Sequence, residues 1–435
     1  MPMNPRELLI ESFRAALSAA DPLAIVPAHL PKPPKGKTVV VGAGKAAAAM
    51  AKAVETHWPA DAPLEGIVIT RYAHGYDGSD AAAIPLTRIR VLEAGHPVPD
   101  EAGEAGAKEI LASAEALTAD DLLLVLVSGG GSSLLSLPVS GITMADLKAV
   151  TTELLSSGAP IEDMNVVRKH LSAIQGGRLA AATKARVLSL IISDVTGDDP
   201  SSIASGPTAP DPSTYQDALD ILAANRIVPP LSVMRHLSNG ARGDIAETLK
   251  PGDAVFSRVE NRMIATAHAS LTRAAAFFQA HGITPMILGD SITGEAREVA
   301  KVHAALARQL QQHHHPLKPP VAMISGGECT VTLRNAGQGR GGRCSEFLLS
   351  LAIDLHARAN IFAIACDTDG IDGSETNAGA YLEPGSLARA RMIDVNAKSQ
   401  LGMNDAYGFF APLDDLIVTG PTRTNVNDYR AILIL

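Results

Sequence analysis

The sequence predicts an α/β protein of two domains, the first built on an open, largely parallel sheet. Short apolar runs alternate with helical patterns along most of the chain, as the strands and crossover helices of such sheets do. A chain of 435 residues is too long for one ordinary domain. Its composition, 46% hydrophobic and 19% charged, is that of a folded protein rather than a disordered one.

In the first half, strands are predicted where apolar, often β-branched residues run together, and helices where the pattern is amphipathic or Ala-rich. A helix opens the chain, and another follows the Gly turn of "VVVGAGKAA". A third is expected in "TMADLKAVTTELLSSG", where Thr143 and Asp146 have the spacing of a capping box. The predicted strands are "TVVVGAG", 65–71, 87–95, 121–127 and the start of 185–199, with a further helix at 101–117.

The sequence is rich in Pro and Ser between about 210 and 255, which predicts a domain boundary there. We therefore expect domains at 1–245 and 246–435. In the second half the expected helices are 268–281, "GEAREVAKVHAALARQL" and "SEFLLSLAIDLHA", and the expected strands are 284–288, 320–325, 360–366 and one near 415–419.

Composition also limits the partners. A formal charge of −9 argues against nucleic acid or an anionic membrane as the main partner. The cysteines, Cys329, Cys344 and Cys366, form no CxxC pair, which fits a reducing cytoplasm and no zinc framework. The N-terminal segment does not resemble a signal peptide, and no uncharged apolar run is long enough to span a bilayer. We expect a soluble, cytoplasmic protein; its oligomeric state is open, with a homodimer as one option.

Three pairs of motifs recur in the same order in the two halves. "LVSGGGSS" is echoed by "MISGGECT", "IISDVTGDD" by "IACDTDGIDG", and "SGPTAPDPSTY" by "TGPTRTNVNDY". Each pair alone is weak, but together they predict that two α/β domains present matching loops at their strand ends. Ligands of open α/β sheets bind outside the carboxyl ends of the strands.

The first motif, Gly42-Ala-Gly44-Lys45, meets a relaxed GxGxxA pattern between a strand and a helix. The acidic residue that a dinucleotide-binding site needs about 20 residues later is missing, and the next strand ends in Arg71. Lys45 places a cation at a helix N-terminus, which already favours anions. It is either an anion-binding residue or an ordinary solvated lysine.

The second motif is a predicted anion cradle. It matches neither a Walker A loop nor a nucleophile elbow. Consecutive glycines can point several N–H groups at one anion, and serine hydroxyls add donors. A tight turn is the simpler alternative, but it needs fewer glycines. The residues concerned are Ser128, Gly129, Gly130, Gly131, Ser132 and Ser133.

A basic segment, "NVVRKHLSAIQGGRLA" (165–180), carries Arg168 and Lys169. Both could neutralise phosphate, although a mixed-charge helix is usually a solvated face.

Two acidic loops follow apolar strands. Asp194 and Asp198 are in the first, with Asp199 beside them, and Asp367 and Asp369 are in the second, which also carries Asp372. Such oxygens suit Mg²⁺ beside phosphates, although acidic clusters are often only turn formers.

The last motifs are "SGGE", with Gly326, Gly327 and Glu328, and "GQGRGGRCSEF" (337–347), where glycines bracket Arg340 and Arg343 before a helix. Arginine binds carboxylate or phosphate with two parallel hydrogen bonds.

Taken together, these motifs resemble the glycerate 2-kinase family of the MOFRL type, from about residue 39 to 425. The resemblance implies ATP- and Mg²⁺-dependent phosphorylation of D-glycerate to 2-phosphoglycerate. It also implies an N-terminal Rossmann-like domain, a smaller C-terminal α/β domain and an active site in the cleft between them. The family's catalytic lysine and arginine fall on Lys45 and Arg343. Where the family has "GGRNQE", this chain has Cys344-Ser345 in place of the Asn-Gln pair.

On this hypothesis Lys45 neutralises phosphate and Arg343 holds the substrate carboxylate or the transferring phosphoryl group. Asp194 and Asp367, with Asp198 or Asp369, bind Mg²⁺ or accept the hydroxyl proton, and the base is not assigned. Whether the 128–133 loop holds ATP phosphate or glycerate carboxylate is also open. An NAD(P)H-dependent hydroxypyruvate reductase is the alternative enzyme, and a non-catalytic metabolite-binding protein the alternative class.

Overall fold

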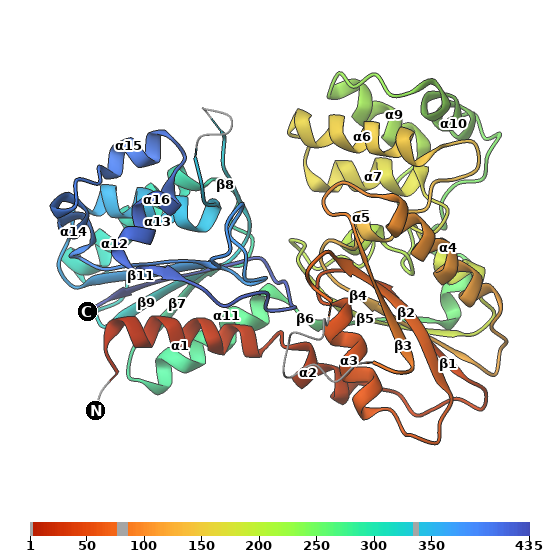
Figure 1. The fold of residues 1–435 in the computed structure, drawn as a ribbon, viewed down its shortest axis with the longest axis horizontal. Coiled ribbons are helices and arrows are strands. Elements are labelled where there is room, and N and C mark those ends of the chain that lie inside the picture. Colours follow the sequence, from red (N-terminus) through yellow and green to blue (C-terminus); the bar gives the residue numbers. More distant parts are fainter. Residues whose placement is uncertain (1–2, 76–85, 334–338) are drawn as a thin grey trace. The chain divides into compact units, whose positions relative to one another are not determined.

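The computed structural model describes residues 3–75, 86–333 and 339–435, and it divides the chain into two compact units (Figure 1). We call residues 22–264 the N-terminal unit, and residues 3–21 together with 265–435 the C-terminal unit. Gly337 and Gln338, which begin the predicted 337–347 motif, lie outside the described residues.

The N-terminal unit is a sheet with helices on both faces. Its strand order, β3-β2-β1-β4-β5-β6, is that of a dinucleotide-binding Rossmann sheet, and the pairs from β3 to β5 are parallel. The strands are β1 (Thr38–Ala43), β2 (Leu64–Arg71), β3 (Ile89–Ala94), β4 (Leu122–Val127), β5 (Arg186–Ile192) and β6 (Val259–Ala265).

Helices of this unit cover the sheet and build a separate helical lobe. Residues of α4 and α8 pack on the sheet face that carries Val41, Val125 and Val187. A second cluster joins α6, α7, α9 and α10, visible as the group of helices at the top right of Figure 1. The α-helices are α2 (Pro22–Ile25), α3 (Ala47–His57), α4 (Glu101–Glu115), α5 (Gly131–Leu134), α6 (Met144–Ser157), α7 (Ile161–Leu171), α8 (Arg178–Ala182), α9 (Tyr215–Ala224) and α10 (Leu231–Ala241), and the 3-10 turns are η1 (Val26–His29), η2 (Ile203–Ser205) and η3 (Ala254–Arg258).

The C-terminal unit has a mixed sheet in the order β13-β12-β11-β14-β9-β7. In this sheet the β7–β9 pair is parallel and the other pairs are antiparallel; β14 lies between β9 and β11 and runs antiparallel to both. The strands are β7 (Thr284–Gly289), β9 (Val321–Ser325), β11 (Ile361–Asp367), β12 (Gly379–Leu382), β13 (Leu416–Ile417) and β14 (Asp428–Ile434), and β8 (Gly294–Glu295) pairs separately with β10 (Cys329–Thr330).

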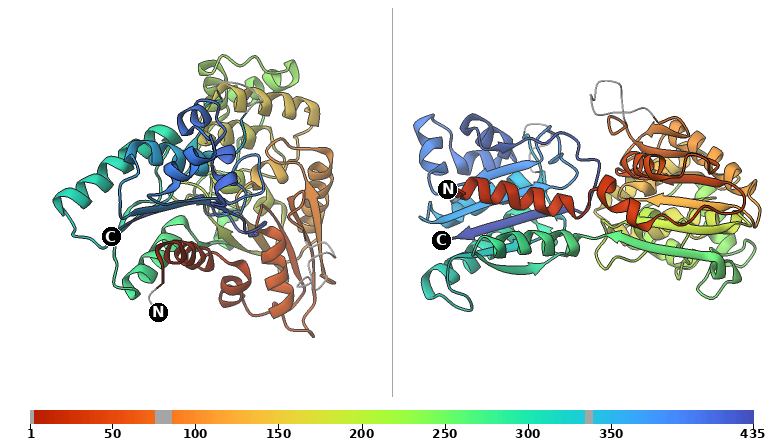
Figure 2. Two further views of the ribbon diagram at one scale, coloured as in Figure 1. Left: turned by 60° about the vertical axis from the view of Figure 1, so that its left-hand side comes forward. Right: turned by 90° about the horizontal axis from the view of Figure 1, so that it is seen from below.

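This second sheet is also covered on both faces. Figures 1 and 2 show α12 and α13 on one face of this sheet and α1 and α11 on the other. Alternate residues of β9, β11 and β14 belong to the two corresponding hydrophobic clusters. The helices are α1 (Pro5–Ser18), α11 (Ala267–Ala280), α12 (Ala296–His313), α13 (Arg343–Leu355), α14 (Ser386–Met392), α15 (Ala397–Gly402) and α16 (Ala406–Phe410), with the 3-10 turn η4 (Ala411–Leu413).

The predicted boundary at 245/246 differs from this division in two respects. β6 lies beyond that boundary yet pairs into the N-terminal sheet, so the unit extends to Ile264. The first helix, expected in the N-terminal domain, belongs to the C-terminal unit. Its Phe13 is buried there and stacks on Tyr429, with ring centroids 5.7 Å apart. An amphipathic pattern predicts a buried helix face but does not say which core receives it.

Candidate functional site

The glycine motifs of the N-terminal unit meet at the carboxyl ends of β1 and β4. These neighbouring strands are where the strand order reverses, the point at which open α/β sheets bind ligands. The backbone of Gly44 approaches Ser128 so closely that a Cβ there would lie 2.1 Å from Ser128 Oγ. Because only glycine permits this contact, the two motifs form one structure, a β1/β4 glycine site of residues 42–46 and 128–133.

Within this site, Lys45 is held by its backbone. Its N–H donates to Gly129 O at 2.8 Å, while the Ala46 N–H donates to Ser128 Oγ at 3.0 Å. The hydroxyl of Ser128 is therefore a structural acceptor at the start of α3, although we expected it to serve as a donor of the cradle. Because these two N–H groups already have acceptors, they are not donors for an anion. In this turn the positive charge is that of the Lys45 side chain.

His96 is a neighbour that sequence reasoning missed. A Cβ added to Gly130 would lie 3.0 Å from His96 Nε2 and 3.5 Å from Lys45 Cγ, so both side chains flank this glycine. His96 follows β3, and nothing in its local pattern distinguishes it from a loop residue.

The serines at the end of the cradle lead into a buried polar network. Ser205 Oγ lies 2.9 Å from Ser132 Oγ and 3.1 Å from Asn165 Oδ1. Ala204 and Ser205 both have left-handed backbones, with φ of 50° and 57°, a costly conformation that tight packing must hold in place. Ser133 instead bonds the Gly130 carbonyl, which is a local turn contact.

Asp194 follows β5, whose Ile191 pairs with Val127 of β4, so the backbone brings it to the same sheet edge as the 128–133 loop. Asp198 lies in a left-handed turn, where its N–H bonds Val195 O. Asp199 accepts hydrogen bonds from the N–H and hydroxyl of Ser201, a turn-forming role. Among these acids, Asp194 alone stays a candidate for chemistry.

In the C-terminal unit, the predicted residues gather around Arg343 at the first position of α13. Its guanidinium bonds Asp428 Oδ1 at 2.7 Å and Asp367 Oδ2 at 2.8 Å, and it lies 3.1 Å from Glu328 Oε1. Burial acts to lower the pKa of Arg343, but Asp428, Asp367 and Glu328 together raise it well above the usual value. Arg343 is therefore a fully paired cation in this structure. Asp428 was not predicted as its partner, because nothing in the sequence marks the start of β14.

The other acids of this edge support the backbone. Asp369 Oδ1 accepts the Ile371 N–H at 2.9 Å. Asp372 is buried and accepts the N–H groups of Cys344 and Ser345 and the Ser345 hydroxyl, at 2.9, 2.8 and 2.6 Å. Asp372 thus caps the start of α13, and the Cys344-Ser345 pair supplies the donors that it binds.

The loop of Gly326 and Gly327 is fixed to the same edge. Arg430 Nη1 donates to Gly326 O at 2.9 Å, and the Asp428 N–H donates to Gly327 O at 3.0 Å. A pocket of about 990 Å³ opens beside Arg343, lined also by Glu346 and Asn404. Across 3–75, 86–333 and 339–435, no group of three or more His, Cys, Asp or Glu side chains is arranged to hold a metal ion.

Fold and site define a class: a two-unit α/β protein with a Rossmann-ordered sheet, a glycine site at its switch point, and a second unit with an arginine–carboxylate edge. Residues 8–238 match the model of a domain of unknown function, DUF4147, and residues 321–428 match the MOFRL family. The chain therefore belongs to the family that combines these two domains. This confirms both the MOFRL-type family and the two-domain α/β fold that the motifs predicted.

Known relatives cover nearly the whole chain. A D-glycerate 2-kinase of Thermotoga maritima is 36% identical over 435 residues, 100% of this chain and 99% of that protein. A crystal structure of glycerate kinase from the same organism superposes with a TM-score of 0.85 at 34% identity, covering 99% of each chain. A protein of Agrobacterium vitis named "Putative hydroxypyruvate reductase" is 49% identical over 433 residues, 99% of this chain and 95% of that protein.

Of the described helices, none combines the length and the apolar character needed to cross a bilayer.

Proposed function

We propose that this protein is a glycerate 2-kinase, which transfers the terminal phosphoryl group of ATP to the 2-hydroxyl of D-glycerate. The observation that carries the proposal is the β1/β4 glycine site, where Lys45 flanks a glycine loop at the switch point of a Rossmann-ordered sheet. Full-length similarity to relatives named as glycerate kinases supports the same reaction.

In this proposal Lys45 neutralises phosphate charge beside the backbone of Gly130, which is partly accessible. Phosphoryl transfer needs positioning and electrostatic stabilisation more than covalent chemistry, so one cation on a rigid turn suits it. Asp194 is the candidate for accepting the hydroxyl proton, because it follows β5 at the sheet edge that carries the 128–133 loop, whereas Asp367 is an ion-pair partner of Arg343 in the C-terminal unit.

The residues also fit a magnesium ion that arrives with the nucleotide. Mg²⁺ is usually bound by phosphates, waters and one or two carboxylates, so it does not need a group of three protein ligands. Asp194 is the carboxylate that would bind it at the β1/β4 site. When bound, the ion would neutralise charge on the transferring phosphoryl group. Asp198 and Asp369, which we also expected at the metal, have turn-forming contacts instead.

Arg343 has a different proposed role from the one its motif suggested. Three carboxylates already neutralise its charge, so a substrate carboxylate would have to displace one of them. We therefore assign Arg343 to positioning Asp367 and Asp428. A site shared by both units stays a prediction. Three buried free cysteines suit a reducing compartment such as the cytoplasm, and the homodimer remains an option.

The reductase alternative is favoured by the name of the Agrobacterium vitis relative. The sheet has the order of a dinucleotide-binding fold, but β2 ends in Arg71 rather than in the acid that binds the ribose of NAD.

An activity assay separates the two enzymes. Purified protein is incubated with D-glycerate, ATP and Mg²⁺, and separately with hydroxypyruvate and NADPH or NADH. The proposal expects ADP that requires D-glycerate, with nicotinamide absorbance unchanged. Cofactor oxidation without ADP formation would establish the reductase. The absence of both ADP formation and cofactor oxidation would favour a binding protein.

A further inference from the structure

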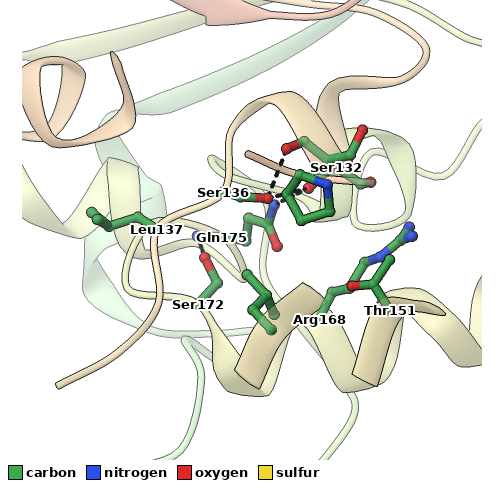
Figure 3. Close-up of a pocket in the computed structure, with 10 residues that line it drawn as sticks. Ser132, Ser136, Leu137, Thr151, Arg168, Ser172 and Gln175 are labelled. Atoms are coloured by element: carbon green, nitrogen blue, oxygen red, sulfur yellow. Dashed lines mark hydrogen bonds between the residues drawn. The ribbon is translucent and has the colours of Figure 1, made fainter. Parts of the chain in front are cut away.

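A small pocket of the N-terminal unit lies between α5, α6 and α7, beside the end of the glycine cradle (Figure 3). The space among its lining residues is about 250 Å³ including solvent at its mouth, so the enclosed part is small. It therefore suits a small head group rather than a nucleotide. Its polar lining is supplied by Ser132, Ser133, Ser136, Thr151, Arg168, Ser172 and Gln175.

Arg168 is the one charged residue of this lining, and only 8% of it is exposed. Its guanidinium forms a long hydrogen bond, from Nη1 to Asn165 Oδ1 at 3.4 Å, and no described carboxylate forms an ion pair with it. Burial without a counter-charge lowers the pKa of Arg168 to about 10. A buried cation is costly unless it is paired, so this guanidinium has donors available for an anion.

The next residue provides an internal comparison. Lys169 is also buried, and its Nζ binds the buried carboxylate of Asp211 at 2.7 Å. The same helix turn thus carries one cation with a protein counter-ion and one without. The mixed-charge run is not the solvated face that such a pattern usually indicates. The position of Arg168 in the last turn of α7 offsets only a small part of its burial cost through the helix dipole.

The groups around the pocket are held in fixed orientations. Asn165 Nδ2 donates to Ser202 O at 3.1 Å, which turns its Oδ1 towards Ser205 and Arg168. Gln175 Nε2 donates to the carbonyls of Ser132 and Leu135, at 2.8 and 2.9 Å. Figure 3 shows Arg168 rising from α7 on the side of the pocket where Ser132 lies.

We propose that Arg168, with the hydroxyl of Ser132, binds the carboxylate of the small hydroxy acid that this protein phosphorylates. The proposal rests on the kinase function for the identity of the acid. A guanidinium fork matches the two oxygens of a carboxylate, and so small a recess does not admit a triphosphate. Ser132 belongs to the loop that Lys45 flanks at Gly130, so one loop would hold the acid at one end and phosphate at the other.

The test replaces Arg168 by Met and by Gln, which remove the charge, and by Lys, which keeps it. We expect Arg168→Met and Arg168→Gln to raise the KM for D-glycerate roughly 10- to 100-fold, the range for hydrogen bonds to charged groups. The KM for ATP should stay within about twofold, and Arg168→Lys should recover part of the loss because Lys lacks the fork. Arg186→Met, on an exposed arginine of the same unit, is the matched control.

Binding without turnover separates this proposal from the kinase function. Calorimetry measures D-glycerate, its neutral amide and inorganic phosphate, each alone, on the wild type and on Arg168→Met. We expect glycerate binding to be lost in the variant, with weak amide binding to both proteins. If the protein fails as a kinase, loss of glycerate binding in Arg168→Met would still support the pocket.

Three results would overturn the proposal. One is an unchanged KM and affinity for D-glycerate in Arg168→Met and Arg168→Gln. Another is a rise in the KM for ATP, or a loss of phosphate binding, with glycerate unaffected, because the pocket would then hold phosphate. The last is an equal loss of activity towards D-glycerate and ATP in both variants, accompanied by a fall in their melting temperature. Loss of folded protein would then explain the result.

Discussion

Lys45 and Arg343 were predicted together as the catalytic cations, yet their surroundings in the structure are opposite. Lys45 flanks a glycine loop that has no acidic side chain in it, whereas Arg343 is enclosed by Glu328, Asp367 and Asp428. A cation surrounded by carboxylates fixes the position of those carboxylates, whereas the loop beside Lys45 supplies backbone groups and glycines. The two residues should therefore respond differently to removal.

Lys45→Ala should lower kcat/KM for the kinase reaction by about 10²–10³, the scale seen when a group that stabilises transition-state charge is removed. The melting temperature should change little, since the backbone N–H of Lys45 keeps its hydrogen bond to Gly129 O in the variant. Steady-state kinetics and a thermal melt measure the two effects. Near-normal kinetics would remove Lys45 from the site, and Lys52→Ala, in the α3 helix that follows Lys45, is the control.

Arg343→Ala should lower both the free energy of unfolding and the kinase activity of the protein. It removes one cationic partner from the buried carboxylates of Asp367 and Asp428, although Asp428 keeps its ion pair with Arg430. Removing one partner of a buried ion pair typically costs about 3–5 kcal/mol. Chemical denaturation measures the free energy of unfolding. An unchanged unfolding free energy with strongly reduced activity would contradict the positioning role and restore the direct anion-binding role that the motif suggested.

Lys169→Met should lower the free energy of unfolding by about 3–5 kcal/mol, because Asp211 would be buried without a counter-charge. Burial acts to raise the pKa of Asp211, but Lys169 and the neighbouring donors hold it below the ordinary value of 3.8. This carboxylate therefore stabilises the folded state at pH values above 3.8, and the stabilisation is lost as the pH falls through the lower folded pKa.

Denaturation from pH 7 down to pH 3 tests this dependence. The gap in unfolding free energy between the wild type and Lys169→Met should be full at neutral pH and should narrow under acid. A gap that widens towards low pH would contradict the assignment.

At the scale of single residues, the sequence located the chemistry-bearing loops but not the partners of each side chain. Arg168 and Lys169 look alike in a mixed-charge run, and only Asp211, 42 positions after Lys169, distinguishes them. In the same way, the role of Ser128 depends on the N–H of Ala46, 82 positions before it.

Among the elements, α1 shows the limit of local patterns most clearly. Its capping box at Asn4 and Glu7 and its apolar face belong to an ordinary amphipathic helix. The core into which it packs is formed by residues from Leu271 onwards, and Tyr429 donates its hydroxyl proton to Ser12 at 2.8 Å. Its membership of the C-terminal unit is a property of the tertiary structure.

Phe13→Ala should destabilise the C-terminal unit by about 3–5 kcal/mol, the usual cost of removing a buried phenylalanine. Hydrogen exchange of the full chain, followed by residue range, should show faster exchange in 265–435 than in the wild type. Exchange in 22–264 should be unaffected. Loss of protection confined to 22–264 would contradict the division, and Val228→Ala, at an exposed position, is the control.

The strands were predicted where apolar runs are bounded by turns, and β1, β4, β9 and β11 lie there. β14 was not predicted, and it changes the second sheet. It pairs antiparallel with both β9 and β11, so the "SGGE" and "CDTDG" loops follow strands that are not neighbours. In the first sheet the corresponding loops follow the adjacent strands β4 and β5. The repeated motifs therefore indicate similar loops but different sheet topologies.

For the whole molecule, alternation of strands and helices is a long-range regularity, and it was sufficient to predict the α/β class. Strand order was not accessible in this way, because it depends on pairings between distant segments. The order β3-β2-β1-β4-β5-β6 matters most for function, since it places the loops after β1 and β4 together at the switch point.

The proposed reaction places phosphate on the 2-hydroxyl of D-glycerate. Nuclear magnetic resonance of the product measures the phosphorylated position directly. The protein is incubated with D-glycerate, ATP and Mg²⁺, and the proton-coupled ³¹P signal of the product is recorded. Phosphate on the 2-hydroxyl is split by the single proton of C2 into a doublet, and this is the result that we expect. A triplet, from the two protons of C3, or the absence of any phosphorylated product, would contradict the claim.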